Sequence, residues 1–81
     1  MARVLLFGPL RDLAGWRERE IAPQPASLFG LKAALSALDP ELGEAIAAPG
    51  VQVAVDKALV RGDVALAATS EIAFLPPMSG G

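Results

Sequence analysis

Five short apolar segments, separated by glycine, proline and aspartate, constrain the fold of this chain more than any other sequence feature. Each has the length and residue pattern of a β-strand. The first is apolar on both faces, which is typical of a central strand, whereas the charges of the second are typical of an edge strand. The five segments cover residues 4–7, 16–21, 51–55, 58–60 and 71–75.

Two helices are expected between the second and third strands. Ser27 is a favourable N-cap for the first helix, and Asp39 followed by Pro40 begins the second. A single helical turn at residues 10–14 would end at Gly15. Apolar residues recur on one face of each of the two longer helices, namely Leu28, Leu31, Ala34, Leu35 and Leu38, then Leu42, Ala45 and Ile46.

This order of elements predicts an α+β fold, with a mixed sheet of about five strands and helices packed on one face. Asp56 and Lys57 suit a tight turn between two strands, because aspartate tolerates left-handed backbone. Residues 61–63 suit another turn. We expect one domain over residues 1–75 and a flexible C-terminal tail over residues 76–81.

The composition excludes several kinds of chemistry. The 81 residues include no cysteine and no histidine, so the chain lacks a thiolate nucleophile, the usual general base and the common metal ligands. Its net charge is −2 and its seven basic residues are scattered, which does not favour nucleic-acid binding. No membrane or targeting segment is evident, so we expect a cytoplasmic location. Because cysteine and histidine are missing, we also expect no tightly bound cofactor or metal.

The C-terminal ending is the most specific functional signal. The strand at residues 71–75 leads directly into Pro76, Pro77, Met78, Ser79, Gly80 and Gly81. A terminal diglycine alone is more often an unimportant chain end. After a strand and two stiff prolines, however, it forms a thin segment that could reach roughly 20 Å and enter a narrow tunnel. Its terminal carboxylate could then be the reacting group.

Three parts of the chain, in order, resemble the MoaD/ThiS family of ubiquitin-like, β-grasp sulfur carriers. Residues 74–81 resemble the aromatic-Leu-Pro-Pro-x-Ser-Gly-Gly ending, and residues 4–15 resemble the opening strand with its R-[DE]-L-x-G turn. Residues 53–60 resemble the central hairpin, in which asparagine commonly replaces Asp56. The usual D-G-D-E turn is absent, since only Glu71 is retained. The helical segment at residues 39–48 favours the MoaD branch, because ThiS proteins are typically shorter.

The resemblance implies that Gly81, preceded by Gly80, is adenylated and then converted to a thiocarboxylate. In the MoaD branch the thiocarboxylate donates sulfur to a pterin precursor during molybdopterin biosynthesis. The implied partners are a MoaE-like large subunit of molybdopterin synthase, a MoeB-like adenylyltransferase that uses ATP, and a sulfur donor system. The chain would be a non-catalytic sulfur-donating subunit, expected in a heterotetramer with two large subunits.

The resemblance also implies that an apolar surface of the sheet contacts these partners. Phe7, Leu59 and Phe74 are candidates, although a core position is an equal alternative for each. Arg11 is a candidate contact, but a solvated charge is its commoner role, as it is for Lys57. The tail residues Pro76, Pro77, Met78 and Ser79 complete the predicted partner-binding set.

Two other functions remain open at this level. The chain could carry sulfur for thiazole synthesis or tRNA thiolation, or be conjugated to proteins like ubiquitin, since all need the same activated tail. It could instead be a β-grasp interaction module whose terminus is chemically inert. Blocking the terminus with an added residue would abolish any carrier but leave such a module functional.

Overall fold

A computed structural model describes residues 2–77 of the chain. They form one five-stranded sheet in the order β2-β1-β5-β3-β4. β1 and β5 are parallel neighbours, and the other neighbouring pairs are antiparallel. The predicted mixed sheet is therefore confirmed, with β1 inside it and β2 at one edge. The strands are β1 (Ala2–Leu6), β2 (Glu18–Ile21), β3 (Gln52–Val55), β4 (Ala58–Val60) and β5 (Glu71–Leu75).

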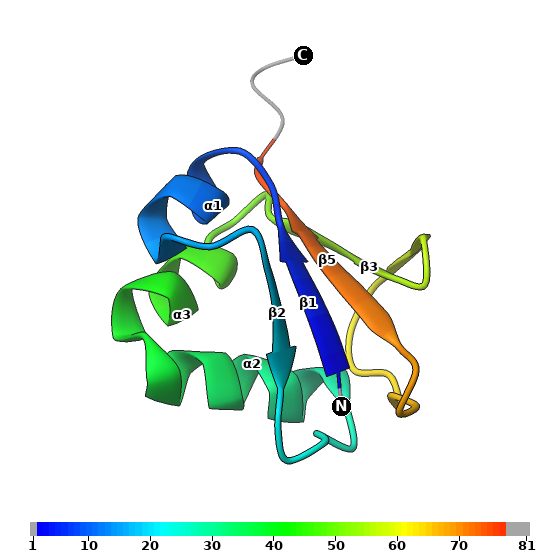
Figure 1. The fold of residues 1–81 in the computed structure, drawn as a ribbon. Coiled ribbons are helices and arrows are strands. Elements are labelled where there is room, and N and C mark those ends of the chain that lie inside the picture. The colour runs from blue at the N-terminus through cyan, green and yellow to red at the C-terminus, as the bar shows by residue number, and fades with distance from the viewer. Residues whose placement is uncertain (1, 78–81) are drawn as a thin grey trace.

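Three helices lie against one face of this sheet (Figure 1). They are α1 (Pro9–Ala14), α2 (Leu28–Leu38) and α3 (Pro40–Ile46). The predicted caps are confirmed: the Ser27 hydroxyl accepts a hydrogen bond from the Gly30 N–H at 3.2 Å, and the Asp39 carboxylate accepts one from the Leu42 N–H at the same distance. Such caps satisfy backbone donors that the first helical turn leaves free.

The core lies between the helices and the covered face of the sheet. Alternate strand residues face it, because successive side chains of a strand point to opposite faces. Val4 and Leu6 of β1 and Ile72 and Phe74 of β5 are completely buried. They pack in one cluster with most residues of the predicted apolar stripes, including Leu28, Leu31, Leu35, Leu42 and Ile46. Leu38, predicted on the same stripe, is exposed instead, at the last position of α2.

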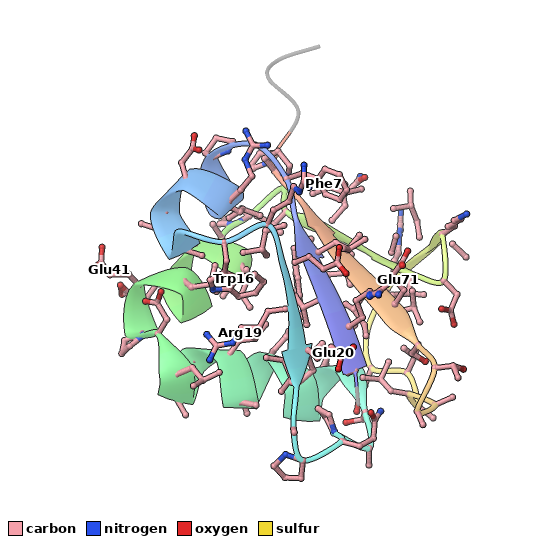
Figure 2. All side chains as sticks on the ribbon, viewed as in Figure 1. Phe7, Trp16, Arg19, Glu20, Glu41 and Glu71 are labelled. Atoms are coloured by element: carbon pink, nitrogen blue, oxygen red, sulfur yellow. The ribbon has the colours of Figure 1, made fainter. Side chains whose placement is uncertain are left out.

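The second strand is shorter than its sequence pattern predicted. Only Glu18–Ile21 pairs with β1. Trp16 is half-buried against the core instead, and the Arg19 guanidinium lies 5.9 Å from the centre of its ring on the helix side of the molecule (Figure 2). The large apolar surface of the indole is partly removed from water when it packs against the core, and this burial favours the observed position over a longer edge strand.

The connections are tied to the sheet by side chains that sequence patterns predicted only as turns. Asp56 and Lys57 have the expected positive φ angles of 50° and 71°. The Asp56 carboxylate also accepts a hydrogen bond from the Glu71 N–H at 2.9 Å, while the Asp56 N–H donates to the Glu71 carbonyl at 2.8 Å. The β3–β4 turn is thus attached to the start of β5.

Asp63, expected only as part of a turn, caps α2 from a distant part of the sequence. Its carboxylate accepts a hydrogen bond from the Phe29 N–H at 2.8 Å. The adjacent Val64 carbonyl accepts from the Leu28 N–H at 2.9 Å. These two bonds add to the local Ser27 cap, so the start of α2 is held from two sides.

The turn before β5, where the D-G-D-E motif is absent, is closed by hydrogen bonds between Ser70 and Ala67. Ser70 is buried, and its hydroxyl accepts a hydrogen bond from the Ala67 N–H at 2.9 Å. Its own N–H donates to the Ala67 carbonyl at 3.0 Å. Ser70 therefore fixes the entry to β5 without the acidic and glycine residues that are usual there. Within residues 2–77, no helix is long and apolar enough to cross a membrane.

Candidate functional site

The candidate site begins where β5 ends. Because β1 and β5 are parallel, both finish at the same end of the sheet. Pro76, which is half-buried, and Pro77, which is exposed, continue from β5 at this end. Figure 2 places Phe7 there too, directly after β1. The predicted Met78, Ser79, Gly80 and Gly81 lie outside the described residues. The expected division at residue 75 coincides with the end of β5 but stays a prediction.

The sheet face opposite the helices carries a row of apolar residues. The strand register aligns Leu5 with Ala73, Ala73 with Ala54, and Ala54 with Leu59. We call these four residues the open-face row. Leu59 at its outer end is 63% exposed. No helix of the described chain covers this face, so the partly or fully exposed members of the row, Leu5, Ala73 and Leu59, are available for contact with another protein, whereas Ala54 is buried.

Two expected contact residues fit this surface. Leu59 belongs to the open-face row, and Phe7, at the end of β1, is 44% exposed. When a partner covers exposed apolar side chains of this size, apolar surface leaves water, and this contributes favourably to the free energy of binding. The structure thus leaves both residues free for the predicted role, which itself stays a prediction.

The prediction that Phe74 contacts a partner is wrong for the folded chain. Its side chain is completely buried and belongs to the core. In register, Phe74 lies between Leu6 and Val53 on the face that the helices cover. The strand period of two residues explains the error, because the open face of β5 instead receives Ala73 and Leu75.

Charged residues surround the apolar row along β1, β2 and β5. The Arg3 guanidinium lies 2.9 Å from a Glu18 carboxylate oxygen and 3.7 Å from a Glu71 oxygen. These side chains remain partly exposed, so they contribute little to stability. One border of the open face therefore carries both positive and negative side chains. A partner with charges in the complementary order would bind there more selectively than a partner of uniform charge.

Arg11 lies on the exposed side of α1 rather than on the sheet. Its guanidinium is 3.9 Å from the Asp12 carboxylate, which is the outer limit of an ion pair. Lys57 is exposed in the β3–β4 turn, away from the helix that carries Arg11. The structure therefore does not bring these two cations together, and it leaves each of them accessible to solvent.

Sequence patterns missed Leu5, Ala73 and Leu75 as surface residues. Each lies in a run that is apolar at almost every position, so the run alone does not say which face stays open. The alternation of Arg3 with Leu5 and of Glu71 with Ala73 is the available signal. The charged residue in each strand marks the face that meets solvent.

A groove of about 480 Å³ lies between α2 and the β3–β4 edge, and Leu59 at the end of the open-face row is one of its lining residues. Apolar side chains line it together with Lys32 and Arg61, and none of its lining residues carries a carboxylate. Since the sequence also has no thiol or imidazole, the groove lacks the carboxylate, thiol and imidazole groups most often used in nucleophilic or acid–base chemistry. Among residues 2–77, no cluster of acidic side chains could hold a metal ion.

Comparisons with known proteins agree with this architecture. The chain is similar to the Escherichia coli (strain K12) molybdopterin synthase sulfur carrier subunit, with 31% identity over all 81 residues and the full length of both proteins. It also resembles the crystal structure of SAMP1 from Haloferax volcanii, with a TM-score of 0.83, 25% identity, and coverage of 99% of this chain and 98% of that one.

A second structure, of H. volcanii small archaeal modifier protein 1, has a TM-score of 0.82 and 23% identity, covering 95% of this chain and 97% of that one. These structural similarities confirm the predicted ubiquitin-like fold. The ThiS family model matches residues 4–81, which is nearly the whole chain. The chain therefore belongs to the ThiS family, the ubiquitin-like sulfur-carrier family that its sequence resembles.

Proposed function

We propose that this protein carries sulfur as a thiocarboxylate on Gly81 and donates it in molybdopterin biosynthesis. The observation that carries the proposal is the full-length similarity, at 31% identity, to the E. coli sulfur carrier subunit of molybdopterin synthase. The diglycine ending and the absence of cysteine and histidine support it, because the terminal carboxylate is the group left for covalent chemistry.

A carboxylate reacts poorly with nucleophiles, because its leaving group would be oxide. The carboxylate oxygen of Gly81 therefore attacks the α-phosphorus of ATP on an activating enzyme, and pyrophosphate leaves. A hydrosulfide ion supplied by the donor system next attacks the acyl carbon, AMP leaves, and the thioacid loses its proton. The product is a thiocarboxylate. ATP is bound by the MoeB-like activating partner, so this chain needs no cofactor site of its own.

Two partners must recognise the same small domain, one to load sulfur and one to accept it. The open-face row and Phe7 provide a surface beside the end of the sheet from which Pro76 and Pro77 emerge. A partner docked there can receive the tail in a tunnel. We propose a heterotetramer with a MoaE-like large subunit, in which two carriers supply the two sulfurs of each precursor.

Intact-mass measurement tests the loading step. The protein is incubated with the activating enzyme, ATP and a sulfur donor, and replacement of one oxygen by sulfur is expected. Addition of the large subunit and the pterin precursor should then return the terminus to carboxylate and yield dithiolene product. The matched control carries one added residue after Gly81, which should block loading without changing the fold.

Gly81→Ala makes a sharper test of the terminal residue. We expect it to impair adenylation and sulfur transfer strongly while leaving the melting temperature unchanged, since residue 81 follows the last strand. The added methyl group would collide with the walls of a tunnel that is only wide enough for a glycine backbone. Sulfur transfer by this variant at the wild-type rate would contradict the proposal.

Protein modification is a second candidate function. The similarity to SAMP1 at a TM-score of 0.83 and 25% identity favours it, because the related structure is named a small archaeal modifier protein. It uses the same activated carboxyl group, but a lysine amine attacks the acyl carbon of Gly81, displaces AMP and loses a proton, which forms an isopeptide bond. Conjugates in the cell that contain the Gly81 carboxyl joined to lysine would support this function. Accumulation of dithiolene product supports the first.

A further inference from the structure

Two glycines from distant connections touch the two prolines at the base of the tail. Gly8 joins β1 to α1, and a Cβ atom placed on it would lie 3.1 Å from Cγ of Pro76. Gly50 precedes β3, and a Cβ atom placed on it would lie 3.0 Å from Cβ of Pro77. Both distances are tighter than ordinary van der Waals contact. Pro76 and Pro77 thus each pass against one glycine.

The other glycines with positive φ angles in the described chain lack this contact. Gly15 has φ 82° and Gly62 has φ 73°, and a Cβ atom at either would meet no atom within 4 Å. Left-handed backbone alone accounts for glycine at those turns. At Gly8 (φ 58°) and Gly50 (φ 91°) the same backbone requirement coincides with close approach to the tail.

This contact constrains the direction in which the tail leaves the domain. The proline ring holds φ near −65°, so a shift of Pro76 or Pro77 is passed on to the residues that follow. A displacement at Pro76 or Pro77 therefore moves the point from which the tail leaves the domain and from which its carboxylate has to reach a partner. Misplacement of a reacting atom by about 1 Å can reduce a rate about a hundredfold.

We propose that Gly8 and Gly50 form a glycine collar that aims the terminal carboxylate at the activating enzyme. They are positioning residues, because they act through Pro76 and Pro77 and do not touch the reacting atoms. The collar rests on the proposed function, since it serves the loading of Gly81. Partner docking on the open face is separate from it, so the collar affects turnover of the docked complex more than affinity.

Gly50→Ala is the first test, with Gly15→Ala and Gly62→Ala as matched controls. All three substitutions place alanine at a positive φ angle, but only the first also meets the tail. Loading is followed by intact mass over a range of carrier concentrations, at a temperature where each variant is folded. We expect the kcat of loading to fall about tenfold for Gly50→Ala, with little change in KM and wild-type values for both controls.

A double-mutant cycle tests Gly8 independently of backbone strain. Pro76→Ala removes Cγ, the ring atom closest to a Cβ atom on Gly8, and leaves Pro76 Cβ at 3.9 Å. The strain of alanine at residue 8 is the same in both backgrounds and cancels in the cycle. We expect Gly8→Ala to slow loading about tenfold with Pro76 present and about twofold or less in the Pro76→Ala background.

The outcomes separate the collar from the proposed function. If the wild-type protein acquires no sulfur, the proposed function fails and the collar fails with it. If the wild type loads but Gly50→Ala matches the Gly62→Ala control, the collar is wrong and sulfur carriage stands. Should Gly50→Ala not fold, Pro77→Gly removes the same contact from the tail side, and wild-type loading by that variant would also overturn the collar.

Discussion

The two faces of the sheet use neighbouring residues of the same strands for different purposes. On the covered face, Leu6 pairs in register with Phe74, and both are completely buried. One residue earlier on each strand, Leu5 pairs with Ala73 on the face that no helix of the described chain covers. That row ends in Leu59, which is 63% exposed.

Under the proposed function, this difference separates the residues that stabilise the fold from those that contact a partner. The covered face gathers the large side chains, which stabilise the fold by leaving water. The open face carries smaller or exposed apolar side chains with charges at its border, so partner contacts can change there without damage to the core. The following substitutions test that separation, beginning with the largest expected effect.

Phe74→Ala should destabilise the protein most. Loss of a buried aromatic ring leaves a cavity and costs about 3–5 kcal/mol, which is a large share of the stability of a small domain. Leu75→Ala is the matched control, because Leu75 is the next residue of β5, lies on its open face and is half-buried. Denaturant unfolding of both variants measures the comparison. Equal losses of stability would show that the two faces do not differ in the way described.

Leu59→Ser should affect partner binding and leave stability nearly unchanged. Removal of an apolar contact from the open-face row should weaken binding of the large subunit about tenfold, or about 1.4 kcal/mol. Titration calorimetry measures this affinity. Leu38→Ser provides the control, since Leu38 is 54% exposed but belongs to α2 on the helix side. If the control weakens binding as much as Leu59→Ser, the contact surface is not confined to the open face.

Arg3→Ala should have the smallest effect. Its ion pairs with Glu18 and Glu71 involve half-exposed side chains, so we expect a loss of less than about 1 kcal/mol. Thermal unfolding at low and high salt measures it, and the loss should shrink at about 1 M salt because exposed charges are then screened. A loss above about 2 kcal/mol that resists salt would mean that the open face contributes to folding as the core does.

Much of the fold could be predicted from local patterns because its signals are local. Ser27, Asp39 and Gly15 mark helix ends through backbone requirements that act within a few residues. Asp56 marks a turn for the same reason. Hydrogen bonds between distant segments leave no local sequence signal. The sequence therefore predicts Asp63 only as a turn residue, although its carboxylate caps α2.

Composition and the chain ending predict the chemistry of the candidate site, which stays a prediction, but they do not predict its surface. The tail ending and the missing cysteine and histidine direct attention to Gly81 without any structure. Phe74 shows the limit, since an aromatic residue beside a reactive tail suits both a core and an interface. The choice depended on which face of β5 the helices cover, and that is decided by packing between elements.

The sequence by itself determined the order of strands and helices, their caps and turns, and the residue proposed to carry sulfur. These follow from side-chain period, backbone preference and composition, which are properties of neighbouring residues. Only the tertiary structure decided that Leu5 meets solvent while Leu6 is buried, and that Gly8 and Gly50 lie against Pro76 and Pro77. The approach of Gly8 to Pro76 depends on the parallel pairing of β1 with β5, and that of Gly50 to Pro77 on the antiparallel pairing of β3 with β5. The burial of Leu6 depends on the face that the helices cover. These pairings bring distant residues together and leave no mark on any one segment alone.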